Sequence, residues 1–218
     1  MFSMITNNLI WTESPWIVII LVLVALIGWL FFRPAFYGAI VLFLFCFYFF
    51  RNPERICPEA LVDHNVIVCP ADGTIVDISY DPNGGLSGDF YQKISIFLSP
   101  LNVHVNWTPI AGIIEKIEYV PGKFMMAFLP KSSELNEHND LLIRHESGKK
   151  VLVRQIAGTV ARRIVCWAKP NQEVAAGQKY GMIKFSSRID LFLSKDVQIN
   201  VGIGQSVYGG KTVIGRLL

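Results

Sequence analysis

Two uncharged, strongly apolar runs near the start of the chain constrain its fold more than any other feature. They cover residues 15–32 and 35–50, and Arg33-Pro34 separates them. Each run is at the short end of the length that a helix needs to cross the hydrocarbon core of a bilayer. Because proline breaks or kinks a helix, this dipeptide suits the turn between two helices. The pattern predicts an α-helical membrane hairpin within residues 1–55.

Three arrangements of this hairpin fit the sequence: two short spans, a pair of helices lying within one leaflet, or a buried helical pair in a soluble core. The first two place the rest of the chain on the side of Arg51 and Arg55, which the positive-inside bias makes cytoplasmic. Arg33, between the two runs, would favour the opposite orientation by the same rule. Residues 1–14 carry no Lys or Arg, so the sequence does not favour a cleaved signal peptide. We predict an inner-membrane protein whose main domain is cytoplasmic.

From Pro58 onward, short β-branched runs alternate with turns rich in Gly, Pro, Asn and Asp. The expected strands are 66–69, 74–78, 93–97, 103–105, 113–117, 141–144, 151–156, 184–193 and 197–201. Residues 81–89 are expected to form a loop, and 124–129 and 132–139 fit either a short helix or an ordered loop. Glycines at the strand joints suit a mainly β sandwich or barrel over 56–218, resembling a lipoyl-type hybrid fold. The Met-Lys-Met tip of such carrier domains is missing, so a carrier function is unsupported.

Charge and cysteine content exclude several classes of function. The net charge is +3, from 20 basic and 17 acidic residues, which lacks the strong basic bias of a nucleic-acid-binding protein. The four cysteines form no CxxC pair, and no His/Cys cluster has zinc-ligand spacing, so we predict no metal. We interpret the cysteines as reduced, mostly packing residues.

A series of motifs then follows in fixed order. They are Tyr-Phe-Phe-Arg-Asn-Pro-Glu-Arg at 48–55, Pro-Ala-Asp-Gly at 70–73, and the segments 96–106, 122–124, 136–139, 155–166 and 185–190. Their order and spacing resemble the phosphatidylserine decarboxylases of the short bacterial type, as do the twin apolar runs. In that family a Gly-Ser bond breaks and the serine becomes a pyruvoyl group. Ser186-Ser187 occupies that place here.

The resemblance implies a specific chemistry. Decarboxylating an α-amino acid leaves electrons on its Cα, and a carbonyl condensed with the substrate amine can accept them. A pyruvoyl cofactor made from Ser187 would supply that carbonyl without a metal. Ser187 Oγ would attack the Ser186 carbonyl, and elimination would leave a large chain, 1–186, and a small chain, 187–218, as a heterodimer. The Cβ of Ser186 predicts slower cleavage than at a Gly-Ser site.

The resemblance also implies catalytic residues, since serine needs an adjacent base. His104, in the Val-His-Val-Asn motif, is the expected base, and Asp72, in the Ala-Asp-Gly motif, is expected to orient it. Taken alone, Asp72-Gly73 would be a turn and His104 a structural histidine. Long family members carry a second histidine where this chain has Trp107, so His104 could serve maturation, decarboxylation or both.

Basic residues are candidates for binding the substrate phosphate. They are Arg162, Arg163 and Lys123. Adjacent strand residues face opposite ways, so at most one of Arg162 and Arg163 points into a given site. His64, His138 and His145 lie among polar neighbours and are expected at the surface.

Three functions compete. The first is a membrane-anchored, pyruvoyl-dependent decarboxylase that converts phosphatidylserine to phosphatidylethanolamine. The second is a non-cleaving homologue that acts as a membrane-bound lipid-binding protein, and Ser186 is its support. The third, an amino-acid decarboxylase with a soluble substrate, conflicts with the apolar anchor. The sequence leaves the order of any higher homo-oligomer open.

Overall fold

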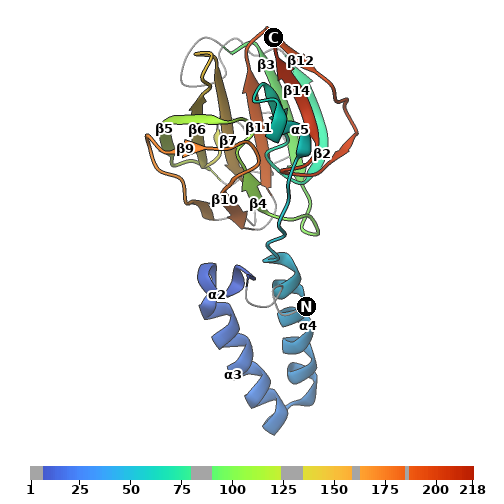
Figure 1. The fold of residues 1–218 in the computed structure, drawn as a ribbon. Coiled ribbons are helices and arrows are strands. Elements are labelled where there is room, and N and C mark those ends of the chain that lie inside the picture. The colour runs from blue at the N-terminus through green and yellow to red at the C-terminus, as the bar shows by residue number, and fades with distance from the viewer. Residues whose placement is uncertain (1–6, 80–89, 124–134, 159–162, 185–186) are drawn as a thin grey trace. The chain divides into compact units, whose positions relative to one another are not determined.

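The computed structural model describes residues 7–79, 90–123, 135–158, 163–184 and 187–218 of the chain (Figure 1). The chain divides into two compact units, Met1–Glu54 and Arg55–Leu218. We call the first the helical unit and the second the β unit. The expected loop at 81–89, the segment 124–129, Arg162 and Ser186 lie outside the described residues.

Two long helices make up most of the helical unit. They are α3 (Pro15–Phe31) and α4 (Arg33–Phe49), preceded by the short α2 (Ile10–Glu13). Each long helix has a proline in its first turn, where the missing N–H has no intrahelical partner to lose. Because α3 ends at Phe31 and α4 begins at Arg33, the chain turns at Phe32.

The two long helices pack closely at the turn. A Cβ on Gly28 would lie 2.5 Å from the backbone nitrogen of Phe36, so only glycine permits this approach. The rings of Trp29 and Phe36 meet edge to face, with centroids 5.2 Å apart. At the other end, Asn8 Nδ2 donates a hydrogen bond of 2.7 Å to the carbonyl of Phe47.

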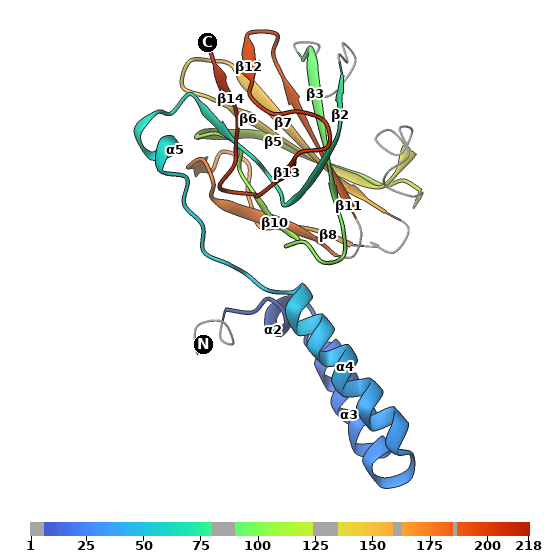
Figure 2. The same ribbon diagram turned by 90° about the vertical axis from the view of Figure 1, so that its right-hand side faces the viewer.

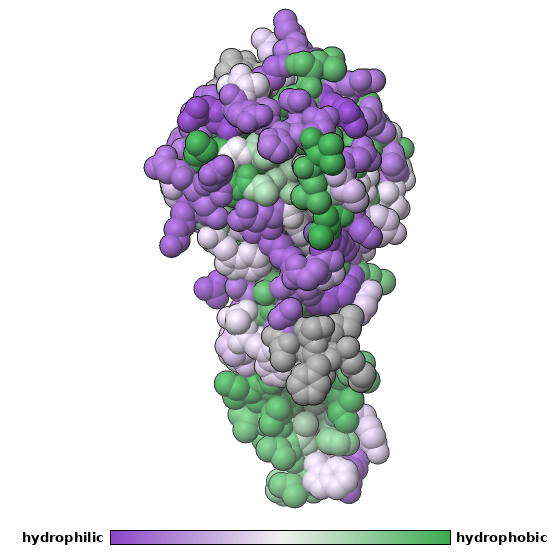
Figure 3. All heavy atoms as spheres, in the orientation of Figure 1, coloured by the Kyte–Doolittle hydropathy of each residue, from purple (hydrophilic) through white to green (hydrophobic). Residues whose placement is uncertain are grey.

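The helical unit exposes much of its apolar surface. Leu30, Phe31 and Val41 are 71%, 82% and 67% exposed, and Figure 3 shows apolar residues covering this unit. Each long helix has 17 residues. Within the described residues, no helix combines the length and apolar character needed to cross a membrane.

The β unit begins with a short helix, α5 (Pro58–Val62), and continues as strands. The strands are β1 (Val66–Val68), β2 (Gly73–Ser79), β3 (Gln92–Leu98), β4 (Val105–Trp107), β5 (Gly112–Val120), β6 (His138–Arg144), β7 (Lys150–Ala157), β8 (Arg163–Cys166), β9 (Glu173–Val174), β10 (Lys179–Lys184), β11 (Ser187–Leu193), β12 (Val197–Ile199), β13 (Ser206–Val207) and β14 (Val213–Leu217).

In the described residues the strands of the β unit form three antiparallel sheets (Figure 2). In the described residues the large sheet has the order β13-β2-β3-β11-β7-β6-β5-β9, and the small sheets have the orders β4-β10-β8 and β1-β14-β12. One cluster of buried apolar side chains draws on all three sheets, with Ile189 from β11, Ile183 from β10 and Ile214 from β14. The arrangement puts β11 inside the large sheet, between β3 and β7.

The mainly β prediction is confirmed, and several details differ. The strand expected at 103–105 starts at Val105, because a turn closed by Asn102 Oδ1 and the Ser99 N–H precedes it. The strand expected over 184–193 is two strands, β10 and β11. Residues 138–139, left open between helix and loop, belong to β6. The lipoyl-type likeness and the membrane role of the helices stay predictions.

Candidate active site

Ser187 opens β11 and is fully buried. It pairs with Leu98 on β3 and Ala157 on β7. Side chains alternate along a strand, and Ile189 belongs to the core cluster, so Ser187 also faces the core. Among the described residues, Ser187 Oγ has no hydrogen-bond partner. Its hydroxyl is therefore a buried polar group available for chemistry.

His104 lies beside the strand that leads into Ser187. Its carbonyl accepts a hydrogen bond of 3.2 Å from the N–H of Ile183 on β10. Its ring is buried, and its Nδ1 lies 3.0 Å from the carbonyl oxygen of Asn102. Since a carbonyl can only accept, Nδ1 is the donor to Asn102, and in the neutral ring Nε2 then carries the lone pair. That is the tautomer that a general base needs.

Asp72 lies in a cluster with Arg55, Trp107 and Gly209. Arg55 Nη1 donates a hydrogen bond to Asp72 Oδ1, and Arg55 Nη2 donates one of 3.0 Å to Asp72 Oδ2. The N–H of Gly209 donates to Asp72 Oδ1 at 2.9 Å. The Arg55 guanidinium stacks 4.8 Å from the centre of the Trp107 ring. The described contacts of Asp72 thus lead to Arg55 and Gly209, and its role toward His104 stays a prediction.

Three amide side chains that the sequence argument did not single out form a buried chain across the core. Gln155 Nε2 donates to Asn106 Oδ1 at 2.8 Å, and Asn139 Nδ2 donates to Gln155 Oε1 at 3.0 Å. The chain links β6 and β7 of the large sheet to β4. All three residues fall inside the family motifs, but only the fold shows that they meet.

The two described basic candidates lie at the surface of the β unit, and Lys123 connects through Asn136 to a strand partner of Ser187. Lys123 forms an isolated bridge with Asn136, and Asn136 Nδ2 donates at 2.7 Å to the carbonyl of Ala157, which pairs with Ser187. Arg163 begins β8 and pairs with Lys184, the last residue of β10. Lys123 and Arg163 are both exposed.

Burial favours the neutral forms of two thiols and one phenol in the β unit. Burial raises the pKa of the Cys69 thiol to about 12, and it raises the pKa of Cys166. Burial also raises the pKa of Tyr180 well above its usual value. All four cysteines are free thiols, which confirms the sequence interpretation. In the described residues, no group of three His, Cys, Asp or Glu side chains is placed to hold a metal ion.

Two histidines expected at the surface are buried instead. His138 is 6% and His145 is 2% exposed, whereas the side chain of His64 is 58% exposed. His138 begins β6, which is covered by β5 and β7 on its two edges, and its Nδ1 lies 2.8 Å from the carbonyl of Asn136. The surface prediction was wrong for these two histidines because it relied on their polar neighbours in sequence.

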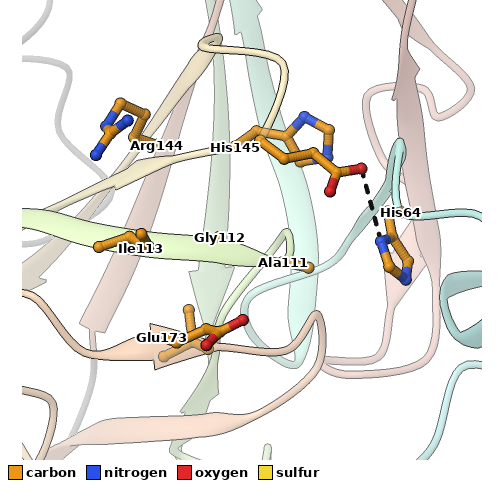
Figure 4. A pocket seen from close by; sticks show the side chains of 9 residues that line it. His64, Ala111, Gly112, Ile113, Arg144, His145 and Glu173 are labelled. Carbon is orange, nitrogen blue, oxygen red and sulfur yellow. Dashed lines mark ion pairs between the residues drawn. The ribbon is translucent and has the colours of Figure 1, made fainter.

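A separate cavity of about 220 Å³ lies elsewhere on the β unit (Figure 4). His64, Ala111, Gly112, Ile113, Arg144, His145, Glu146, Glu173 and Val174 line it. His64 pairs with Glu146 at 3.7 Å, and Arg144 pairs with Glu115 at 3.7 Å. Among the described residues, those predicted for catalysis and substrate binding are absent from this lining, so the cavity is not our candidate site.

Comparison with known proteins identifies the family. Residues 42–215 match the family model for phosphatidylserine decarboxylase. A phosphatidylserine decarboxylase proenzyme from Syntrophus aciditrophicus (strain SB) is 44% identical over 172 residues, which is 79% of each chain. A protein of the same name from Desulfotalea psychrophila is 43% identical over 175 residues, 80% of each chain. The chain therefore belongs to the phosphatidylserine decarboxylase family of enzymes, which confirms the resemblance seen in its motifs.

Proposed function

We propose that this chain converts phosphatidylserine to phosphatidylethanolamine with a pyruvoyl group, formed when the chain cleaves itself between Ser186 and Ser187. One observation carries the proposal: Ser187 opens a central strand with a fully buried hydroxyl that has no partner among the described residues. A hydroxyl in that state lowers stability, and a role as the nucleophile accounts for its place at the start of β11. The family membership points the same way.

Maturation uses Ser187 and a base. Ser187 Oγ gives its proton to His104 Nε2 and bonds to the Ser186 carbonyl carbon, whose bond to the Ser187 nitrogen breaks. Loss of the Ser187 Cα proton then expels the Ser186 carboxylate. The dehydroalanine that remains takes up a proton on Cβ and becomes an imine, and water hydrolyses the imine to a ketone at the start of 187–218 with release of ammonia. His104 is suited to this because the Asn102 carbonyl holds the proton on its other nitrogen.

The pyruvoyl group supplies the carbonyl that accepts the electrons left on the substrate Cα when CO₂ departs. The neighbouring residues suit such a group, because the surrounding core is apolar with neutral amides and holds a buried histidine. We assign Lys123 and Arg163, together with Arg162, to the substrate phosphate. We assign Asp72 to orienting His104, through the cluster that it shares with Arg55 and Trp107.

Residues 1–55 are proposed to anchor the enzyme in the inner membrane, with the decarboxylase domain, 56–218, on the cytoplasmic side. Support comes from the exposed apolar side chains of α3 and α4 and from two arginine–aromatic pairs near the helix ends. Arg33 stacks 3.8 Å over Trp29, and Arg51 stacks 3.9 Å over Tyr48. Such an anchor would keep the acyl chains of the substrate in the bilayer while its head group enters the site.

Intact-mass measurement tests the proposal. The purified protein should give a 187–218 fragment that lacks a free N-terminal amine, and hydroxylamine should add to it and abolish decarboxylation. The matched variant Ser186→Gly should cleave faster, because glycine opens the carbonyl to attack. A single 24.5 kDa species with no decarboxylation would instead favour the non-cleaving lipid-binding alternative.

A further inference from the structure

The hydrogen bonds of Ala157 show which way its backbone faces. Its N–H donates at 2.9 Å to the carbonyl of Glu137, and its carbonyl accepts at 2.7 Å from Asn136 Nδ2. Both groups are therefore directed to the β6 side of β7, away from β11. Opposite residues in an antiparallel ladder alternate between pairs that exchange both hydrogen bonds and pairs that exchange none. Ala157 and Ser187 are therefore a pair of the second kind.

The other side of the large sheet gives an independent reading of Ser187. On β2, the N–H of Ile75 donates at 3.0 Å to the carbonyl of the residue that precedes β13. Thr74, the neighbour of Ile75, then faces β3, where it pairs with Phe97. Because Phe97 faces β2, the next residue, Leu98, faces β11, where it pairs with Ser187.

Both readings give the same assignment for the start of β11. Ser187 and Leu98 are a hydrogen-bonded pair, in which the N–H of each residue points at the carbonyl of the other. Both residues are fully buried, so water does not compete for these groups. The nitrogen of Ser187 is the one that the proposed self-cleavage releases. The carbonyl oxygen of Leu98 therefore faces the atom that leaves.

The charge on this nitrogen changes during the proposed self-cleavage. As Ser187 Oγ bonds to the carbonyl carbon before it, the bond from that carbon to the Ser187 nitrogen breaks, and its electron pair stays on the nitrogen. The proton that left Oγ is delivered to the nitrogen, which becomes an amine. Because an amide nitrogen leaves only as it is protonated, it carries positive charge while the bond breaks. A hydrogen bond from a charged donor is roughly twice as strong as one between neutral groups.

We propose that the carbonyl oxygen of Leu98 accepts a hydrogen bond from the Ser187 nitrogen during self-cleavage and stabilises the positive charge that forms there. The Leu98 carbonyl is then a catalytic group of maturation, supplied by the backbone of β3. Because the group belongs to the backbone, no residue type at position 98 indicates it. The inference rests on the proposed self-cleavage.

A backbone ester tests the role of this carbonyl. Glyceric acid, the α-hydroxy analogue of serine, replaces Ser99 during cell-free synthesis of the full chain. The Leu98 carbonyl then belongs to an ester, which is a weaker hydrogen-bond acceptor than an amide. The 187–218 fragment, followed by intact mass, should appear about tenfold more slowly than in wild type, because the weakened hydrogen bond has a charged donor.

The same analogue at Ser95 is the matched control. It weakens the carbonyl of Ile94, which by the same alternation faces Leu191, further along the same two strands. Each ester removes one N–H and weakens one carbonyl, so the two chains should unfold at similar temperatures. The ester at position 95 should nevertheless cleave at the wild-type rate.

A second control isolates the turn that follows β3. The ester at position 99 also loses the hydrogen bond of 2.9 Å from the Ser99 N–H to Asn102 Oδ1. Asn102→Ala removes that acceptor and leaves the Leu98 carbonyl in an amide. It should therefore slow cleavage less than the ester at position 99 does.

Hydrogen exchange serves if the ester at position 99 does not fold. In the uncleaved variant Ser187→Ala, the N–H at position 187 should exchange with deuterium far more slowly than the same N–H in a short peptide, because the Leu98 carbonyl accepts from it. Exchange at the rate of the short peptide would contradict the pairing and overturn the inference.

The outcomes of the ester experiment are distinct. Cleavage of the position-99 ester at the wild-type rate overturns the inference alone. Equal slowing by the esters at 95 and 99 also overturns it, because the effect then follows the stability of the ladder. Slowing by Asn102→Ala as large as that of the position-99 ester assigns the effect to the turn, with the same consequence. A wild-type chain that yields no 187–218 fragment overturns the proposed function, and this inference with it.

Discussion

The two faces of β11 treat buried polar groups in opposite ways. On the face turned away from the core cluster, Arg188 and Asp190 form a two-bond ion pair at 2.6 and 2.9 Å. The neighbouring strands continue it, with Arg154 and Asp140 joined by two bonds of 2.7 Å. On the core face, Ser187 keeps a buried hydroxyl without a partner among the described residues. Adjacent residues of β11 therefore have different roles on its two faces.

The difference separates groups that hold the strand from groups that react. Buried charges are tolerated only where each is paired and hydrogen-bonded, as on the outer face. An unpaired buried hydroxyl weakens the fold, and Ser187 carries one at the proposed cleavage site. Substitutions on the outer face should therefore change stability, and substitutions on the core face should change the reaction.

The largest effect is expected for Ser187→Ala. Removing the nucleophile should lower the cleavage rate by about 10⁶-fold, the scale seen when a nucleophilic serine is deleted. The unfolding temperature should stay the same or rise, because an unpaired hydroxyl is lost. Intact mass and denaturation by heat measure the two quantities.

Ser95→Ala is the matched control, since Ser95 is fully buried and its Oγ also has no partner in the described part of the chain. Ser95 lies on β3 opposite Asp190, so it belongs to the outer face. Its variant should cleave at the wild-type rate. Loss of cleavage in Ser95→Ala would contradict the division between the two faces.

Asp190→Ala tests the outer face. It leaves the buried Arg188 guanidinium without its two-bond carboxylate, which should cost about 3–5 kcal/mol of unfolding free energy. Urea titration measures the cost, and the molecules that fold should still cleave. The double variant Arg188→Met, Asp190→Leu should recover much of the stability, because it removes both charges together. If the double variant is no more stable than Asp190→Ala, the ion pair is not the cause.

Cys69 predicts how the core responds to alkali. Its pKa is raised by burial to about 12, from 9.0 in an unfolded chain. Between these two pKa values the thiol ionises in the unfolded chain but not in the folded one. The free energy of unfolding is therefore unaffected below pH 9 and falls as the pH rises from 9 toward 12. The expected loss is about 1 kcal/mol between pH 9 and 10. Urea titrations of wild type and Cys69→Ala measure it, and the variant should show a shallower decline.

The smallest effect is expected at the surface. Arg216 pairs with Glu59 at 3.2 Å and with Asp63 at 3.1 Å, and its side chain is 47% exposed. Exposed pairs contribute little, so Arg216→Ala should change the unfolding free energy by less than about 1 kcal/mol. A loss as large as that of Asp190→Ala would mean that exposure does not separate the two kinds of pair.

Local pattern predicted the elements, and long-range contacts decided the site. The apolar runs and β-branched segments gave the helices of the first unit and the β-rich second unit because each depends on neighbours in sequence. The link between Asn106 and Gln155 joins different sheets, and the pairing of Asp72 with Arg55 depends on where the chain returns. The periodicity of apolar residues along the sequence does not predict contacts between such distant segments. The prediction that His138 is exposed was wrong. Its polar neighbours in sequence indicated a surface position, but it begins β6, a strand that lies between β5 and β7.

The position of β11 between β3 and β7 governs what self-cleavage would leave behind. The break would fall at the first residue of an interior strand, and the seven pairs with β3 together with those along β7 would remain. Separating the pieces would require opening the large sheet. The nicked protein should melt as one cooperative body, and its two polypeptides should part only under denaturing conditions.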